Sequence, residues 1–196
     1  MTDPAKPDNA TPTEANTDSR RTFLKRSGLS VAGTGLAASI TTLAQLVHAQ
    51  GSASLKLGLV GCGGRGSGAA LQALRADPNT ELVAVADAFG DKAERSLKNL
   101  KADEKVGERV NTTPDTTFIG LDAYKKVIDM SDVVLLCTPP GFRPQHFRAA
   151  VEAGKHIFTE KPMATDFPGV RSVIESVKMS KEKNLAVLAG LSLIHI

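Results

Sequence analysis

Short apolar runs alternate with amphipathic segments along the chain from residue 55 onward. The apolar runs predict five strands, at Leu55–Val60, Glu81–Ala86, Val133–Thr138, His156–Thr159 and Leu185–Ala189, and a weaker sixth at Arg109–Thr113. The segments between them predict helices at Ser67–Arg75, Lys92–Lys101, Leu121–Ile128, Pro144–Ala153 and Pro168–Glu182. A run that is apolar at nearly every position, as in residues 133–137, is typical of a strand buried on both faces. We therefore expect an α/β fold, with a doubly wound parallel sheet covered by helices.

Residues 1–49 follow a different pattern, which predicts an export signal. Residues 1–18 are rich in Pro, Thr, Asn and Asp, a composition typical of a disordered leader. A charged start, a mildly apolar stretch and a small-residue end then follow, and residues 19–25 (SRRTFLK) resemble the twin-arginine signal. A transmembrane anchor is the alternative, but Ser, Gly, Thr and Gln dilute the apolar stretch. We therefore expect cleavage after Ala49 and export to the periplasm by the twin-arginine machinery, with no stable membrane anchor.

The composition is that of an ordinary globular protein, with 41% hydrophobic and 23% charged residues. It excludes collagen-like, disulfide-rich and fully disordered proteins. The net charge of +3 is spread along the chain, so no segment has the dense positive charge that nucleic acid binding requires. Cys62 and Cys137 have no second Cys or His at metal-ligand spacing, so the sequence indicates no metal site. We expect both cysteines to be packing residues rather than a redox pair.

A glycine-rich turn follows the first predicted strand and opens the first predicted helix. It matches the dinucleotide-binding pattern G-x-G-x-x-G with Gly61, Cys62, Gly63, Gly64, Arg65 and Gly66. In that pattern Gly61 permits the tight turn, Gly63 lets a pyrophosphate approach the backbone, and Gly66 lets helix and strand pack closely. N–H groups at the helix start would face the phosphates, with Arg65 either a further contact or a solvated residue of the helix start. A glycine-rich linker would imitate the motif, but its place between strand and helix favours a Rossmann-type nucleotide-binding fold.

Asp87 closes the second predicted strand about 20 residues after the last glycine of this turn. An acidic residue there is expected to bind the hydroxyls of the adenine ribose. Its charge would repel the extra phosphate of NADP, and no Arg follows it directly, so we expect NAD in preference to NADP. The alternative is a carboxylate that only stabilises the turn at the strand end.

Two further stretches carry a resemblance to a known family. The first is residues 137–140 (CTPP), followed by a helix that carries His146, and the second is residues 154–162 (GKHIFTEKP). Together with the glycine turn, and in this order, they resemble the nucleotide-binding half of the Gfo/Idh/MocA oxidoreductases. That family includes glucose-fructose oxidoreductase and inositol dehydrogenase. The resemblance runs from about Leu55 to Gly190.

The resemblance implies the positions of the remaining site residues. The cofactor would be lined at the carboxyl end of the fourth strand, and on the helix that follows, by Thr138, Pro139, Pro140 and His146. The fifth strand would end under the nicotinamide ring with Glu160, Lys161 and Pro162, and the Lys161–Pro162 bond is one that such a turn can hold in cis. Lys161 would be the catalytic residue, which holds a substrate hydroxyl and stabilises the alkoxide. Without the resemblance, Glu160 and Lys161 would be interpreted as an exposed turn pair.

Members of this family carry a second domain that supplies substrate contacts and usually the general base. Nothing after Leu185 can provide it, and residues 191–196 (LSLIHI) depart from the basic continuation of the family. We therefore expect residues 50–190 to form an NAD-binding domain and residues 191–196 to be a non-native tail on a truncated product. Such a chain would bind nucleotide without turning over substrate, and His195 is not a candidate catalytic residue. Homo-oligomers would form only through the missing domain.

The leading prediction for the full-length protein is an exported NAD-dependent oxidoreductase that acts on a sugar or polyol. Because no nucleotide pool exists outside the cytoplasm, we expect it to bind its cofactor before export and to keep it. The first alternative is a glycoside hydrolase of the same fold that oxidises C3, eliminates the aglycone and reduces the carbon again. The second is a non-catalytic module that binds nucleotide or sugar.

Overall fold

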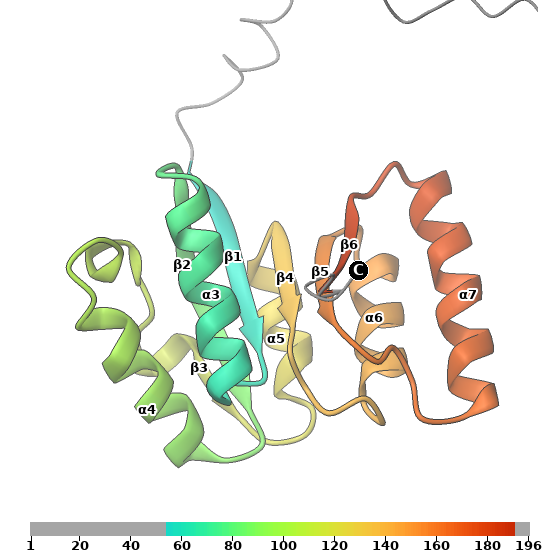
Figure 1. The fold of residues 1–196 in the computed structure, drawn as a ribbon, viewed down its shortest axis with the longest axis horizontal. Helices are drawn as coiled ribbons and strands as arrows, with labels where there is room; N and C mark the ends of the chain where they lie inside the picture. Colours follow the sequence, from blue (N-terminus) through green and yellow to red (C-terminus); the bar gives the residue numbers. More distant parts are fainter. Residues whose placement is uncertain (1–53, 191–196) are drawn as a thin grey trace, which may run out of the picture. The chain divides into compact units, whose positions relative to one another are not determined.

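The computed structural model describes residues 54–190, so the expected export signal and the tail at 191–196 lie outside the described residues. Strands and helices alternate along the chain (Figure 1). The strands are β1 (Leu55–Val60), β2 (Thr80–Asp87), β3 (Thr117–Ile119), β4 (Val133–Leu136), β5 (His156–Glu160) and β6 (Val187–Gly190). The helices are α3 (Gly64–Ala76), α4 (Gly90–Lys101), α5 (Ala123–Met130), α6 (Arg143–Glu152) and α7 (Phe167–Glu182), with short 3₁₀ turns at Gly107–Arg109 and Pro114–Thr116.

The six strands form one parallel sheet in the order β3-β2-β1-β4-β5-β6. The first strand of the described residues, β1, lies in the middle of this sheet. The chain then moves outward through β2 and β3 and returns to β4 on the other side of β1. This reversal of direction between β1 and β4 is the topological switch point of a doubly wound sheet, where α/β proteins bind their ligands. The predicted Rossmann-type fold is confirmed.

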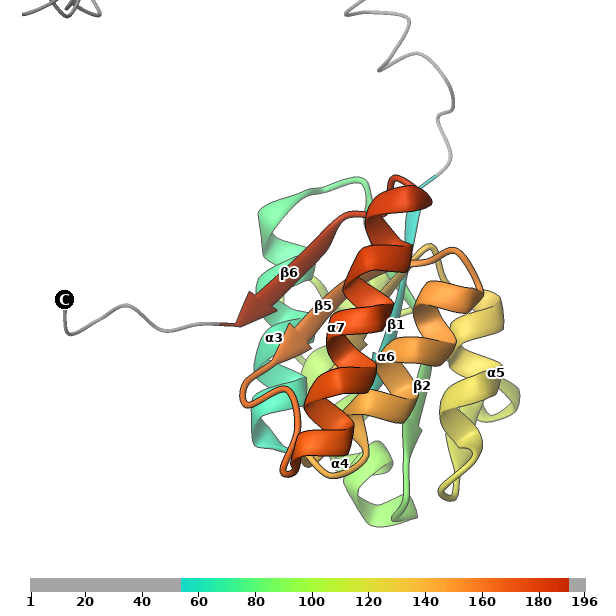
Figure 2. The ribbon, with the colours of Figure 1, turned by 90° about the vertical axis from the view of Figure 1, so that its right-hand side faces the viewer.

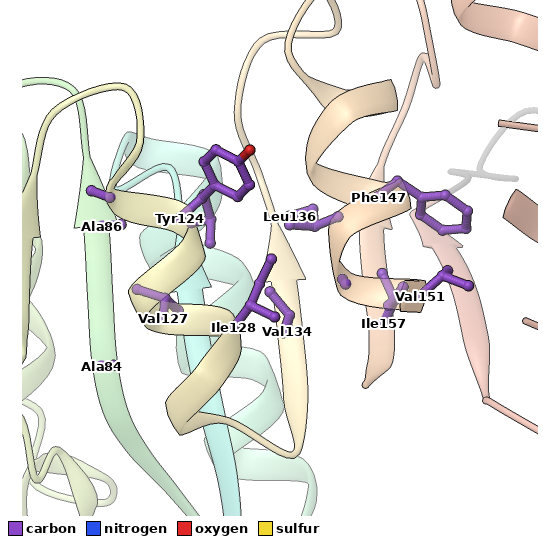
Figure 3. Close-up of a cluster of buried hydrophobic side chains, with 13 residues drawn as sticks. Ala84, Ala86, Tyr124, Val127, Ile128, Val134, Leu136, Phe147, Val151 and Ile157 are labelled. Carbon is purple, nitrogen blue, oxygen red and sulfur yellow. The ribbon is translucent and has the colours of Figure 1, made fainter. Parts of the chain in front are cut away.

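Helices cover both faces of the sheet, α3 and α4 on one and α5, α6 and α7 on the other (Figure 1, Figure 2). The buried apolar side chains form two clusters, one on each face of the sheet. Because successive side chains of β1 point to opposite faces, Leu57 and Leu59 pack in the cluster beneath α3 and α4, and Val60 packs in the second cluster, beneath α5 and α6. In the second cluster, Figure 3 shows Tyr124 and Val127 of α5 together with residues of β2, β4 and α6. Strands that are apolar at nearly every position need both of their faces buried, and the two clusters provide this.

The prediction of a strand at Arg109–Thr113 is wrong. Its start lies in a 3₁₀ turn, Val110 forms only an isolated bridge with Leu82, and the third strand lies further on, at Thr117–Ile119. The Arg109 guanidinium donates to the carbonyl oxygens of Leu74, Asp77 and Thr80, which holds this segment across the ends of α3 and β2. Pro114 then begins a second 3₁₀ turn, because proline has no N–H for a strand ladder.

No helix within residues 54–190 combines the length and the apolar character that crossing a bilayer requires.

Candidate nucleotide-binding site

A cavity of about 1050 Å³ lies at the carboxyl ends of the central strands. Its walls include the last residues of β1, β2 and β5 and the loop after β4, so it occupies the switch point between β1 and β4. The predicted site residues that line it are Gly61, Gly63, Arg65, Asp87, Thr138, Pro139, His146, Glu160 and Lys161. Other predicted site residues, Cys62, Gly64, Gly66, Pro140 and Pro162, lie nearby in sequence but do not line it. The fold thus brings together residues that are up to a hundred positions apart.

Packing within the protein explains two glycines of the turn. Gly61 has a φ of 95°, in the left-handed region, and a Cβ on it would lie 2.7 Å from the carbonyl carbon of Cys137. A Cβ on Gly66 would overlap the carbonyl oxygen of Gly61. The first glycine therefore allows the turn against the loop after β4, and the last allows α3 to start close to β1.

Gly63 differs from these two glycines, because beyond its own atoms and those of its two chain neighbours no protein atom lies within 4 Å of the position of an added Cβ. It lines the cavity and is the N-cap residue of α3, a helix with no side-chain cap and no acidic residue in its first turn. The first N–H groups of a helix lack intrahelical partners and attract anions. The residues present therefore fit a dinucleotide, whose diphosphate would lie against the backbone at Gly63 and the start of α3.

Asp87 stands at the end of β2, beside the glycine turn. Its Oδ2 accepts the backbone N–H of Cys62 at 2.7 Å, and its Oδ1 accepts the N–H of Phe89 at 3.0 Å. The carboxylate is therefore fixed in the cavity wall, and each oxygen retains acceptor capacity for a hydroxyl of a ligand. The two interpretations of Asp87, a turn residue and a ribose ligand, are compatible in this geometry.

Both cysteines near the turn carry free thiols. Burial raises the pKa of Cys62 to about 12, and the negative charge of Asp87 adds to the shift. Burial likewise raises the pKa of Cys137 to about 12, with the charge of Glu160 as the next cause. Both side chains are neutral thiols at pH 7, and Cys62 contributes its backbone N–H rather than its sulfur to the site.

An ion pair joins the glycine turn to the end of β5. Arg65 Nε lies 2.6 Å from Glu160 Oε1, with the Arg65 side chain 51% exposed and the Glu160 side chain 8% exposed. Both residues line the cavity. A guanidinium is therefore already held beside the expected diphosphate position, and a buried carboxylate next to Lys161 has its charge balanced.

His146 supports the loop after β4. Its Nδ1 lies 3.2 Å from Thr138 Oγ1, and its ring stacks on Tyr124 with the centroids 4.1 Å apart. Burial lowers the pKa of His146 to about 4, and the positive charge of Arg143 adds to the shift. The imidazole is therefore neutral at pH 7, which suits a group that holds Thr138 in place better than one that transfers protons.

Lys161 is exposed and follows the last residue of β5 on the cavity wall. The Lys161–Pro162 peptide bond is cis. Within residues 54–190, no group of three or more His, Cys, Asp or Glu side chains is arranged to hold a metal ion.

Sequence reasoning missed several cavity residues. Arg143, at the start of α6, is 3% exposed, and its guanidinium donates to the carbonyl oxygens of Thr138 and Pro162. A single Arg before a proline has the sequence signature of a solvated helix start, so no pattern distinguishes it. Phe89 and Leu121 also line the cavity, and their exposed fractions of 65% and 66% are large for apolar side chains. Phe89 could have been found, because it is an apolar residue shortly after the end of the second predicted strand, whereas Leu121 follows β3, a strand that the sequence pattern did not predict.

The comparisons with known proteins agree with this geometry. The family described as "Oxidoreductase family, NAD-binding Rossmann fold" (Gfo/Idh/MocA) matches residues 55–190. The inositol 2-dehydrogenase of Cereibacter sphaeroides is 29% identical over 123 residues, which are 63% of this chain and 33% of that protein. A glycosyl hydrolase family 109 protein of Streptomyces coelicolor is 27% identical over 130 residues, 65% of this chain and 26% of that protein. This chain thus spans about a third or less of the length of these curated relatives.

Solved structures show the same fold. A scyllo-inositol dehydrogenase from Lactobacillus casei with bound NAD(H) and scyllo-inositol has a TM-score of 0.54 and 23% identity, over 70% of this chain and 36% of that one. A 3-ketoreductase from Actinomadura kijaniata in complex with NADP and TDP-benzene has a TM-score of 0.51 and 25% identity, over 70% of this chain and 37% of that one. By the family match over residues 55–190, this chain belongs to the Gfo/Idh/MocA oxidoreductase family and contains its NAD-binding Rossmann fold.

Proposed function

We propose that the full-length protein is an exported NAD(P)-dependent oxidoreductase that acts on a sugar or polyol and keeps its cofactor tightly bound. One observation carries this proposal: the glycine turn, Asp87 and Lys161 lie on the wall of one cavity at the switch point of the sheet. The polyol and sugar names of the relatives support the substrate class.

Each group on the cavity wall has a chemical task in this proposal. Backbone N–H groups at Gly63 and the start of α3 bind the diphosphate, and Asp87 binds ribose hydroxyls. When bound, the cofactor supplies a nicotinamide ring that accepts or donates a hydride. The Lys161 ammonium stabilises negative charge on the substrate oxygen as the hydroxyl proton leaves. The general base comes from the part of the protein beyond this chain.

The preference for NAD over NADP stays a prediction, because solved relatives contain either cofactor. The carboxylate of Asp87 supports it, since a fixed negative charge on the wall disfavours a 2′-phosphate.

The test of the catalytic proposal is turnover by the full-length protein. With a second sugar supplied to take the hydride back from the bound cofactor, Lys161→Ala is expected to lower kcat for polyol oxidation by at least about a hundredfold, since transition-state charge stabilisation by one group is worth this much. Nucleotide binding should stay largely intact, because the proposed diphosphate and ribose contacts are made by Gly63, the start of α3 and Asp87 and not by Lys161. The matched control is Lys178→Ala, an exposed lysine of α7. Undiminished turnover in Lys161→Ala would refute the role of Lys161, and a folded protein that binds nucleotide without turnover would favour the non-catalytic module.

A redox glycoside hydrolase is the second candidate, favoured by the similarity to the Streptomyces coelicolor protein. The two candidates separate when the full-length protein is incubated with aryl glycosides and with free sugars or polyols in parallel. We expect free polyols to reduce the bound cofactor, up to one NADH per site, with no release of the aryl group. Aryl release without net NADH formation would instead identify the hydrolase.

Export and cofactor retention have separate tests. Residues 1–49 fused to a folded reporter should carry it to the periplasm, and replacement of Arg20 and Arg21 by Lys should stop this transport. The purified full-length protein should retain nearly stoichiometric nucleotide through dialysis. A reporter that stays in the cytoplasm would refute export. A purified protein without bound nucleotide after dialysis would refute cofactor retention.

A further inference from the structure

Two loops on the cavity wall are joined by one buried side chain. The loop after β4 contains Thr138, and the turn after β5 contains Lys161 and Pro162. The guanidinium of Arg143 donates through Nη2 to the carbonyl oxygen of Thr138 and through Nη1 to that of Pro162. Arg143 itself is the first residue of α6, so its backbone is fixed by a third element. One planar group therefore sets the spacing between the ends of two neighbouring strands.

Burying the Arg143 guanidinium costs free energy of folding. This cost argues that the side chain does more than fill space. The side chain is 3% exposed, and its Nε is buried without a hydrogen-bond partner. Burial of a charge, and of an unpaired donor, is unfavourable, and here burial lowers the pKa of Arg143. Both acceptors are neutral carbonyl groups, and the negative charge of Glu160 offsets only part of the cost of burying the guanidinium. An apolar side chain would pack in the same place without this penalty.

The same helix turn also holds the side chain of Thr138. His146 lies three residues after Arg143, one helical turn along α6, and its Nδ1 is 3.2 Å from Thr138 Oγ1. Thr138 is thus held by its backbone through Arg143 and by its side chain through His146. Pro162, which follows Lys161 directly, has the Arg143 contact at its carbonyl oxygen. The position of Lys161 relative to the loop after β4 therefore depends on Arg143.

We propose that Arg143 is a positioning residue, which holds the Lys161–Pro162 turn at a fixed distance from Thr138 and so shapes the nicotinamide end of the cavity. The inference rests on the proposed function, because it assigns the nicotinamide ring to the space between these two loops. The adenosine and diphosphate contacts, at Asp87 and Gly63, belong to other strands. Loss of Arg143 should therefore weaken the contribution of the nicotinamide half to the binding affinity and leave the contribution of the adenosine diphosphate half unchanged.

The test compares two ligands, NAD and ADP-ribose, which differ in the nicotinamide ring. The parent chain, Arg143→Met and Arg143→Lys are titrated with both by calorimetry, and thermal unfolding is recorded for each variant. In Arg143→Met the affinity for NAD should fall by about tenfold, because the Lys161–Pro162 turn is no longer held at the spacing that fits the nicotinamide ring, while the affinity for ADP-ribose is unchanged. Arg143→Lys should recover only part of the loss, because one ammonium does not reproduce the planar fork. Millimolar guanidinium should restore NAD affinity in Arg143→Ala, whose short side chain leaves space for the ion.

The matched control is Arg148→Met, which removes an exposed arginine of α6 that pairs with Glu152 and Glu175. It should change neither affinity. Equal losses for NAD and ADP-ribose, or no loss for either, in Arg143→Met would overturn the inference. If Arg143→Met does not fold, the same comparison in Arg143→Lys decides, and unchanged NAD affinity there overturns it. A parent chain that binds neither ligand would refute the proposed function itself. A parent chain that binds both ligands, with variants of equal affinity, would refute only the role of Arg143.

Discussion

At the residue scale, two glycines of one turn are required for different physical reasons. Gly66 has protein against it, since a Cβ would overlap the Gly61 carbonyl oxygen. An added Cβ on Gly63 would project into open space on the cavity wall. Any need for glycine at this position therefore comes from the ligand and not from protein packing. This difference separates the folding role of the motif from its binding role.

Substitution by alanine tests this difference. Gly63→Ala should fold with an unchanged melting temperature and lose at least about tenfold in NAD affinity, because the added methyl group takes space needed by the diphosphate. Gly66→Ala should lose both stability and binding. Gly68→Ala, in the same helix with open space around it, should bind normally and gain about 0.5–1 kcal/mol in stability. Normal NAD binding by Gly63→Ala would contradict the assignment of the diphosphate to this turn.

Asp87→Asn tests cofactor choice. The amide keeps one acceptor for the backbone N–H groups but removes the charge that disfavours a 2′-phosphate. The ratio of Kd for NADP to Kd for NAD should fall by about tenfold, which corresponds to about 1.4 kcal/mol of lost repulsion. Asp91→Asn removes an equal charge from the first turn of α4 and serves as the control. A ratio that is unchanged in Asp87→Asn, measured by calorimetry, would show that Asp87 does not discriminate.

His146 gives stability a dependence on pH. Its folded-state pKa of about 4 lies below the usual 6.5, so the unfolded chain takes up the proton first as the pH falls. The contribution is complete above pH 6.5, is lost between about 6.5 and 4 at up to about 1.4 kcal/mol per pH unit, and is constant below. Urea unfolding at pH 7 and pH 5 should show a smaller loss in His146→Phe than in the parent. Equal losses in the two proteins would contradict this prediction.

The sequence identified those residues whose role follows from a local sequence pattern. Gly61, Gly66 and Asp87 have fixed places relative to a strand and a helix, and they lie where that pattern requires. Arg143 could not be predicted, because its role depends on two carbonyl groups that the fold brings together from separate loops.

At the scale of elements, the approach of α5 to β1 depends on Gly58. A Cβ there would overlap Ser131 Oγ and lie 2.5 Å from Val127 Cγ1, both on or directly after α5. The pairing of β1 with β2 also shifts register between Leu57 and Gly58. The glycine therefore lets a helix lie unusually close to the central strand.

Gly58→Ala should destabilise the fold by about 1–3 kcal/mol, the usual cost of overpacking a filled core. Gly58 does not line the cavity, so the NAD affinity of the folded fraction should be unchanged. Chemical unfolding measures the first quantity and calorimetry the second. A fully stable Gly58→Ala protein would show that α5 can shift without cost.

Elements were predictable where hydrophobic pattern and packing agree, as in β1, β4 and β5. The segment at Arg109–Thr113 has strand-forming residues, but the side chain of Arg109 bonds to three carbonyl groups at the ends of α3 and β2. Such a tertiary contact is invisible in a local pattern, so the strand was predicted a few residues too early.

At the scale of the whole molecule, some apolar side chains remain exposed at one end of the sheet. Leu188 of the edge strand β6 is 65% exposed, and Phe167 at the start of α7 is 83% exposed. We nevertheless predict that the 196-residue chain is a monomer of 20.6 kDa by light scattering, because the family resemblance implies that subunits associate through a second domain. A stable dimer that disappears in Leu188→Ser would contradict this expectation and identify the edge as an interface.

The interpretations of residues 1–49 as an export signal and of residues 191–196 as a non-native tail stay predictions, since both lie outside the described residues. The fold and the cavity do not depend on either.

The central claim is that the cavity at the switch point binds a nicotinamide dinucleotide, and calorimetric titration of the folded 196-residue chain with NAD tests it most directly. We expect saturable binding at one site, competed by ADP-ribose and weakened at least about tenfold in Gly63→Ala. A folded chain that gives no binding heat with NAD or NADP across several temperatures, and that releases no nucleotide on denaturation, would contradict it.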